Sequence, residues 1–119
     1  MPSGWTMQAK RRERNGIEAE VFERQARICK AFANATRLQM LELLGQRDWS
    51  AADLQEYLDI SKANLSQHVA ILKVAGIVGA RREGGRMYLS LVMPEAKKAC
   101  HLIHEVLRAQ VRNGKRLIS

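Results

Sequence analysis

The chain has 119 residues, of which 46% are hydrophobic, so it has room for one domain with a substantial core. Twenty lysines and arginines against twelve aspartates and glutamates give a formal net charge of +8, which favours a polyanionic partner; ordinary solubility charge is the alternative. The sequence has neither an apolar run long enough to span a membrane nor the apolar centre of a secretory signal, so we expect a cytoplasmic protein.

The first 16 residues show no apolar periodicity and hold a basic run at positions 10–14. We interpret residues 1–16 as a flexible basic N-terminal arm, which would lie along DNA phosphates. The alternative is a disordered leader or a helix extension that contacts nothing.

Two helices are predicted next. From Ile17 to Ala33 the apolar residues recur at helical spacing, which predicts one amphipathic helix. Asn34 can cap the following helix, whose leucines surround it on nearly all sides and suit the centre of a domain. We expect Arg37 to brace helix ends or a carboxylate, and Trp49 to close the edge of the core.

The middle of the chain predicts a helix-turn-helix. Ser50 and Asp53 resemble a capping box at the start of a short helix, and Ser61 caps a second helix that has one apolar stripe. The tight link between them indicates that the second helix is the DNA reader. Its other face carries side chains able to bond base edges and phosphates: Lys62, Asn64, Ser66, Gln67 and His68. For His68 the alternative is a half-buried hydrogen-bonding residue beside Leu72.

A β-hairpin is predicted directly after the reader helix. Gly76 marks the end of that helix, and segments 77–82 and 86–91 flank a Gly84-Gly85 turn in which glycine supplies positive φ. A hairpin in this place is a wing. The arginines expected to meet the phosphate backbone beside the groove are Arg81, Arg82 and Arg86.

The last predicted helix begins at Pro94 and ends near Asn113-Gly114. It carries an apolar seam that a domain this small cannot cover, so we expect the first and last helices to pair with their copies in a homodimer. The chain then divides into the arm, a DNA-binding and dimerisation domain at 17–113, and a short basic tail at 114–119.

Several short motifs fall together in one order: the run 31–44, then Asp53-Leu54, Ile60-Ser61, the run 65–68 and the run 76–78. In this order and spacing they resemble the ArsR/SmtB family of bacterial winged-helix repressors, over roughly residues 17–112. The resemblance implies a mainly α fold with a small β-hairpin wing, in the order α-α-α-α-β-β-α. It also implies a homodimer that binds operator DNA and is released by an inducer or oxidant.

The sequence gives little support for a metal site or for a catalytic site. His101 and His104 lie three apart on the last helix, a spacing that can share a metal, but two ligands are too few. Zinc-sensing relatives add Asp and His near the start of that helix, where this chain offers only Glu95. The paired cysteines of the arsenic and cadmium branch are also missing near Trp49. With no phosphate loop or nucleophile motif either, we expect no metal site, no cofactor and no enzyme.

The two cysteines, Cys29 and Cys100, fall on the apolar seams of the first and last helices. They are either small buried hydrophobes or a redox pair whose thiolates are stabilised by nearby cations. These cations are Arg27, Lys30, Lys97, Lys98 and His101. Some family members resembling this chain answer reactive sulfur or oxidants through a cysteine of the first or second helix and one of the last.

We therefore expect a sequence-specific DNA-binding transcriptional repressor. It would act as a dimer on an inverted repeat whose half-sites lie about one helical turn apart. A thiol-reactive sulfur species or oxidant acting on Cys29 and Cys100 would release it from operator DNA. Alternatives are a metal-responsive repressor of the same family, a winged-helix protein-interaction adaptor and a small thiol-redox enzyme.

Overall fold

The computed structural model describes the backbone of residues 2–114 and the side chains of residues 16–114. Within this range the order of elements is α1 (Pro2–Phe32), α2 (Ala35–Gln46), β1 (Trp49–Ser50), α3 (Ala51–Leu58), α4 (Lys62–Val74), β2 (Val78–Glu83), β3 (Arg86–Leu91) and α5 (Glu95–Arg112). The mainly helical architecture with a β-hairpin wing is the one expected from the sequence. None of the helices in the described part of the chain is long and apolar enough to cross a membrane.

The chain divides into two compact units, with the boundary between Lys30 and Ala31. The first unit is the long helical segment of α1. This helix begins at Pro2, whereas the sequence predicted a helix only from Ile17 and an irregular arm before it. The backbone of the arm is therefore helical from its second residue, and the side chains of its basic run lie outside the described residues.

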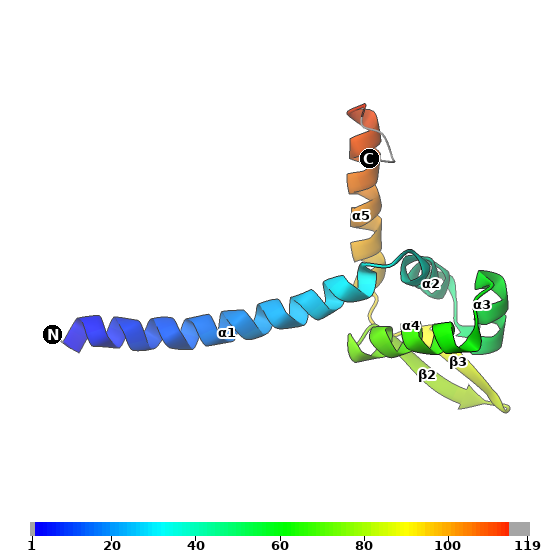
Figure 1. The fold of residues 1–119 in the computed structure, drawn as a ribbon, viewed down its shortest axis with the longest axis horizontal. Coiled ribbons are helices and arrows are strands. Elements are labelled where there is room, and N and C mark those ends of the chain that lie inside the picture. Colours follow the sequence, from blue (N-terminus) through cyan, green and yellow to red (C-terminus); the bar gives the residue numbers. More distant parts are fainter. Residues whose placement is uncertain (1, 115–119) are drawn as a thin grey trace. The chain divides into compact units, whose positions relative to one another are not determined.

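The second unit contains the core, to which α2–α5 and the sheet all contribute. In this unit, α4 runs beside the hairpin of β2 and β3, and α5 follows the hairpin in the chain (Figure 1). The largest fully buried side chains are Met40, Leu41, Leu54, Leu72 and Leu89. Helices α3 and α4 thus bury one apolar side each, whereas α2 packs apolar side chains on several of its sides, as its sequence indicated.

Polar side chains cap three of the helices at the positions predicted from the sequence. Asn34 Oδ1 accepts from the backbone N–H of Arg37 at 3.1 Å, and Ser50 Oγ accepts from that of Asp53 at 3.0 Å. Ser61 Oγ does the same for Asn64 at 3.0 Å. Each bond satisfies one of the backbone donors that a helix start leaves without a partner.

The sheet has three antiparallel strands in the order β1-β3-β2. In the hairpin, Val78 lies opposite Leu91 and Glu83 opposite Arg86, which leaves Gly84-Gly85 as a two-residue turn. Both glycines have positive φ, 58° and 79°, as the tight turn of a twisted hairpin requires. The two-residue strand β1 was not predicted; it exists because Trp49 and Ser50 pair with the far side of β3.

Candidate nucleic-acid interface

Helix α4 is oriented by its apolar side and held at both ends. Leu65 and Leu72 are buried in the core. After the last turn, the backbone N–H of Ile77 donates to the carbonyl of Leu72 at 3.0 Å, and the backbone N–H of Gly76 donates to the carbonyl of Lys73 at 2.9 Å. Gly76 has a φ of 76°. This pair of bonds is the usual glycine-dependent helix stop. Because both ends and one side are fixed, the opposite side of α4 faces outward in a defined way.

The outward side of α4 carries most of the predicted groove residues. Lys62, Asn64, Ser66 and Gln67 are exposed, and each can donate to base edges or phosphates. Ala63, between Lys62 and Asn64, and Ala70, one turn after Ser66, are also exposed, and sequence reasoning did not single them out.

Small side chains let a helix approach the floor of a major groove and can contact a thymine methyl group. A stripe of polar residues interrupted by alanine is therefore well shaped for insertion into DNA.

His68 differs from its neighbours. Its ring is only partly exposed, and its Nδ1 lies 3.1 Å from NH1 of Arg37 on α2. Burial, and then the positive charge of Arg37, lower the pKa of His68 below its ordinary value of 6.5. The structure thus gives His68 the half-buried hydrogen-bonding role that the sequence left open as the alternative to a groove contact.

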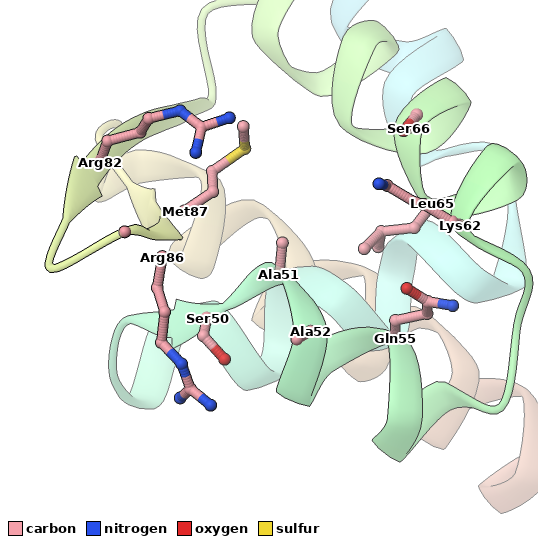
Figure 2. Close-up of a pocket in the computed structure, with 11 residues that line it drawn as sticks. Ser50, Ala51, Ala52, Gln55, Lys62, Leu65, Ser66, Arg82, Arg86 and Met87 are labelled. Atoms are coloured by element: carbon pink, nitrogen blue, oxygen red, sulfur yellow. The ribbon is translucent and has the colours of Figure 1, made fainter.

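A groove with a volume of about 400 Å³ lies between the wing and the two helices of the helix-turn-helix. In Figure 2 the wing side chains stand on one side, those of α4 on the other, and Ala51 of α3 between them. Four predicted site residues line this groove together: Lys62, Ser66, Arg82 and Arg86. Leu65 and Met87 add apolar surface. Lys62, Arg82 and Arg86 are cations, and three cations that line an open groove create a positive potential that suits a phosphate backbone.

Arg81 has a different place in the wing from Arg82. Successive residues of a strand point to opposite faces, and Arg81 lies outside the groove that Arg82 lines. Its guanidinium bonds Asp48 Oδ2 at 2.6 Å, Glu83 Oε2 at 3.1 Å and Ser90 Oγ at 3.1 Å.

The hydrogen bond to Asp48, followed by the one to Glu83, raises the pKa of Arg81 above its usual value. Arg81 was predicted to meet DNA phosphates; in the structure its guanidinium is engaged by Asp48 and Glu83 and ties the wing to the loop before β1.

Comparison with known proteins places this architecture in a family. The model of the bacterial regulatory protein arsR family matches residues 34–79, the segment that holds the helix-turn-helix. The transcriptional activator HlyU of Vibrio cholerae is 33% identical over 103 residues, which cover 87% of this chain and 90% of HlyU. The chain belongs to the ArsR family. It is a DNA-binding transcriptional regulator, as the sequence led us to expect.

Two further proteins are similar to this chain, one in sequence and one in structure. The transcriptional repressor SdpR of Bacillus subtilis is 39% identical over 64 residues, covering 54% of this chain and 71% of SdpR. The homodimeric winged helix-turn-helix DNA-binding domain Mb0332 of Mycobacterium bovis superposes with a TM-score of 0.74 at 29% identity, covering 81% and 89% of the two chains. The relatives include an activator and a repressor, so membership of the ArsR family alone leaves the direction of regulation open.

The two cysteines lie in different compact units and in different environments. Cys29 of α1 is exposed, whereas Cys100 of α5 is buried. Burial, and then the nearby carboxylate of Glu42, raise the pKa of the Cys100 thiol. Burial therefore acts against the thiolate that the flanking cations were expected to favour at Cys100.

The histidines of α5 lie on the helix surface. His101 Nε2 is 3.8 Å from Glu105 Oε1, and Glu105 also pairs with Arg108. Among the described residues no group of three or more His, Cys, Asp or Glu side chains is arranged to hold a metal ion.

Proposed function

We propose that this ArsR-family regulator is a repressor that inserts α4 into the major groove of operator DNA and lays the wing along the adjacent phosphates. The observation that best supports the proposal is that the outward side of α4 and the cationic groove form one continuous surface. The polar outward side of α4 runs into the cationic groove, because Lys62 and Ser66 belong to both. In this arrangement Gln67 and Asn64 read base edges, and Arg82 and Arg86 position the protein on the backbone.

The test of this function is salt-dependent, sequence-selective DNA binding. We would select a duplex from a random-sequence library with the wild-type protein and measure its affinity by fluorescence anisotropy against a scrambled duplex of equal length. The proposal predicts that the selected duplex binds at least about 1,000-fold more tightly, and that both affinities fall as salt rises. Equal affinity for the two duplexes would leave the chain as an adaptor that uses its winged helix for protein contacts.

The same protein is proposed to be a homodimer. Large apolar side chains are exposed along α1 and α5, including Ile17 at 67%, Phe22 at 65%, Leu102 at 64% and Val106 at 62%. Apolar stripes of this size on two helices indicate a protein contact, and pairing with a second copy covers both stripes by one symmetric interface. A twofold dimer presents two copies of α4 to half-sites about 34–36 Å apart on an inverted repeat.

A charged substitution on the α5 stripe tests the dimer. Val106→Lys places a cation in the proposed interface, whereas the control His104→Lys places one at another exposed position of the same helix. Sedimentation equilibrium should show a monomer only for Val106→Lys. If both variants remain dimeric, the interface lies elsewhere.

For the signal that releases DNA, we propose a thiol-reactive oxidant that acts first on Cys29, because this cysteine is exposed. With hydrogen peroxide, the Cys29 thiolate attacks one peroxide oxygen, the O–O bond breaks, and sulfenic acid and hydroxide form. The Cys100 thiol then gives up its proton and attacks that sulfur, and the hydroxide that it displaces leaves as water, giving a disulfide. A covalent link between α1 and α5 would alter the dimer and the spacing of the two α4 helices, which lowers DNA affinity.

Mass spectrometry after brief peroxide treatment should find Cys29 modified before Cys100. The Cys100→Ser variant should stop at Cys29 sulfenic acid, and the Cys29→Ser variant should stay reduced. An unchanged DNA affinity in oxidised wild-type protein would remove the thiol switch and leave the DNA-binding function intact.

A further inference from the structure

Arg37 joins three helices at one point. The residue is only 7% exposed, and its Nε donates to the carbonyl of Ala31 in the last turn of α1 at 2.9 Å. Its NH1 donates to Nδ1 of His68 on α4 at 3.1 Å. Arg37 itself lies in the first turn of α2, directly after the Asn34 cap. The end of α1, the start of α2 and the middle of α4 are thus held by one guanidinium.

This is a costly place for an arginine. Burial removes its charge from water, and the start of a helix is the positive end of the helix dipole, where acidic side chains are favoured. An apolar side chain of similar size would fill the space without these costs. What a guanidinium adds is direction, because its donors are fixed in one plane and each demands an acceptor in a defined place.

The contact also fixes the protonation state and the tautomer of the His68 ring. A guanidinium has no acceptor, so the Nδ1 of His68 must accept, and the ring is neutral with its proton on Nε2. The His68 ring of α4 and the Ala31 carbonyl are thus linked through one guanidinium.

We propose that Arg37 is a positioning residue for DNA recognition, which sets the rotation of α4 by holding His68 and the Ala31 carbonyl at the same time. The inference rests on the proposed function of α4 as the reader helix. Gln67 precedes His68, so any rotation that moves one moves the other.

Even a small rotation of α4 is enough to disturb its contacts with bases. Side-chain ends lie about 5–6 Å from a helix axis, so a rotation of 10° moves them by about 1 Å. A hydrogen bond to a base edge tolerates only a few tenths of an ångström. Release of the Arg37–His68 contact should therefore reduce the preference for one sequence more than the attraction to DNA in general.

Protonation of His68 releases this contact in the wild-type protein. A proton on Nδ1 replaces the acceptor with a donor and places two cations side by side. Arg37, from α2, is the charged group that acts on the ring; the other two histidines, His101 and His104, are exposed on α5. Sequence preference should therefore fall as the pH is lowered through and below 6.5, the ordinary pKa of histidine. A His68 that touched a phosphate would give the opposite sign, with tighter binding at low pH.

The experiment compares two substitutions of the same residue. His68→Asn keeps an acceptor near the position of Nδ1 but does not titrate, and His68→Leu keeps the size and removes the acceptor. Affinities for the duplex selected by wild-type protein at pH 8, and for its scrambled control, are measured between pH 8 and pH 5.5 in a His101→Gln, His104→Gln background. Circular dichroism establishes that each variant is folded under these conditions.

At pH 8, His68→Leu should lose about tenfold of the preference for the selected duplex, as for one lost base contact, and His68→Asn should keep it. The fall in preference towards pH 5.5 should appear with His68 and vanish with His68→Asn. Arg37→Lys, which keeps the charge but not the planar fork, should behave like His68→Leu. A folded His68→Leu with wild-type preference, or a pH profile unchanged by His68→Asn, would overturn the inference. If the wild-type protein selects no duplex at pH 8, the reader function itself fails.

Discussion

Two adjacent arginines of the wing have different expected roles, one in contact with DNA and the other in support of the wing. Arg82 lines the groove beside α4, whereas Arg81 is held by Asp48, Glu83 and Ser90. Arg82→Ala should therefore remove a phosphate contact, and Arg81→Ala should not. The two substitutions change the net charge of the protein by the same amount, so each is the control for the other.

The expected size follows from counterion release. Each neutralised phosphate contributes about −0.9 to the slope of log affinity against log salt, so Arg82→Ala should make the slope shallower by about one. Between 50 and 200 mM salt the wild-type protein should then lose about 3.5-fold more affinity than this variant. The loss should be the same for the selected and the scrambled duplex, because phosphate contacts carry no sequence information.

The assay is fluorescence anisotropy at four or more salt concentrations, with thermal unfolding of both variants as the measure of folding. Arg81→Ala should keep the wild-type slope and lower the unfolding temperature, since it frees the wing from the loop that holds Asp48. A shallower slope for Arg81→Ala with an unchanged slope for Arg82→Ala would show that the two faces of the wing have been assigned the wrong way round.

Four other predictions concern base reading, the wing tip, the pH dependence of stability and the packing of the core. Gln67→Ala or Asn64→Ala should lower the preference for the selected duplex by about 1–3 kcal/mol each. Arg86→Ala should instead weaken binding to all duplexes similarly and reduce the salt slope by about one. Fluorescence anisotropy measures both effects, and exchanged results would contradict the groove and wing assignments. Because the pKa of His68 is lowered in the folded state, the unfolded chain takes up the proton first as the pH falls below 6.5, and the free energy of unfolding should decrease from that pH downward. Urea unfolding at several pH values should show this decrease in the wild-type protein and a smaller one in His68→Asn. Leu54→Ala, at a fully buried position of α3, should cost about 2–5 kcal/mol in the same experiment, and a cost below 1 kcal/mol would mean that the helix-turn-helix core is not packed as described.

Much of the fold could be predicted because its signals are local. The caps at Ser50 and Ser61, the glycine stop after α4 and the Gly84-Gly85 turn each depend on residues within a few positions of one another. Apolar periodicity then placed the helices, and the order of motifs indicated the family. The outward polar face of α4 follows from the same periodicity, so Gln67 and its neighbours could be found without a structure.

What the sequence did not predict depends on distant partners. Strand β1 has only two residues and exists because it pairs with β3, so no alternation could reveal it. Arg81 and Asp48 are 33 positions apart, and Arg37 and His68 are 31 apart. The sequence predicted that Arg37 braces helix ends, and its bond to the Ala31 carbonyl fits that prediction. Only the fold shows that Arg37 also reaches His68 and that Arg81 ties the wing to Asp48.

The helical backbone before Ile17 is a further difference from the prediction. A helix without an apolar stripe gives no periodic signal, and the segment 2–16 has none.

The most direct test of the account is the ratio of affinities for the selected and scrambled duplexes, measured with the wild-type protein and with Gln67→Ala at one salt concentration and pH 8. The account predicts a wild-type ratio of at least about 1,000, which Gln67→Ala reduces by about five- to 150-fold through a weaker hold on the selected duplex. A wild-type ratio near one, or a ratio that Gln67→Ala leaves unchanged, would contradict the claim that α4 reads DNA sequence.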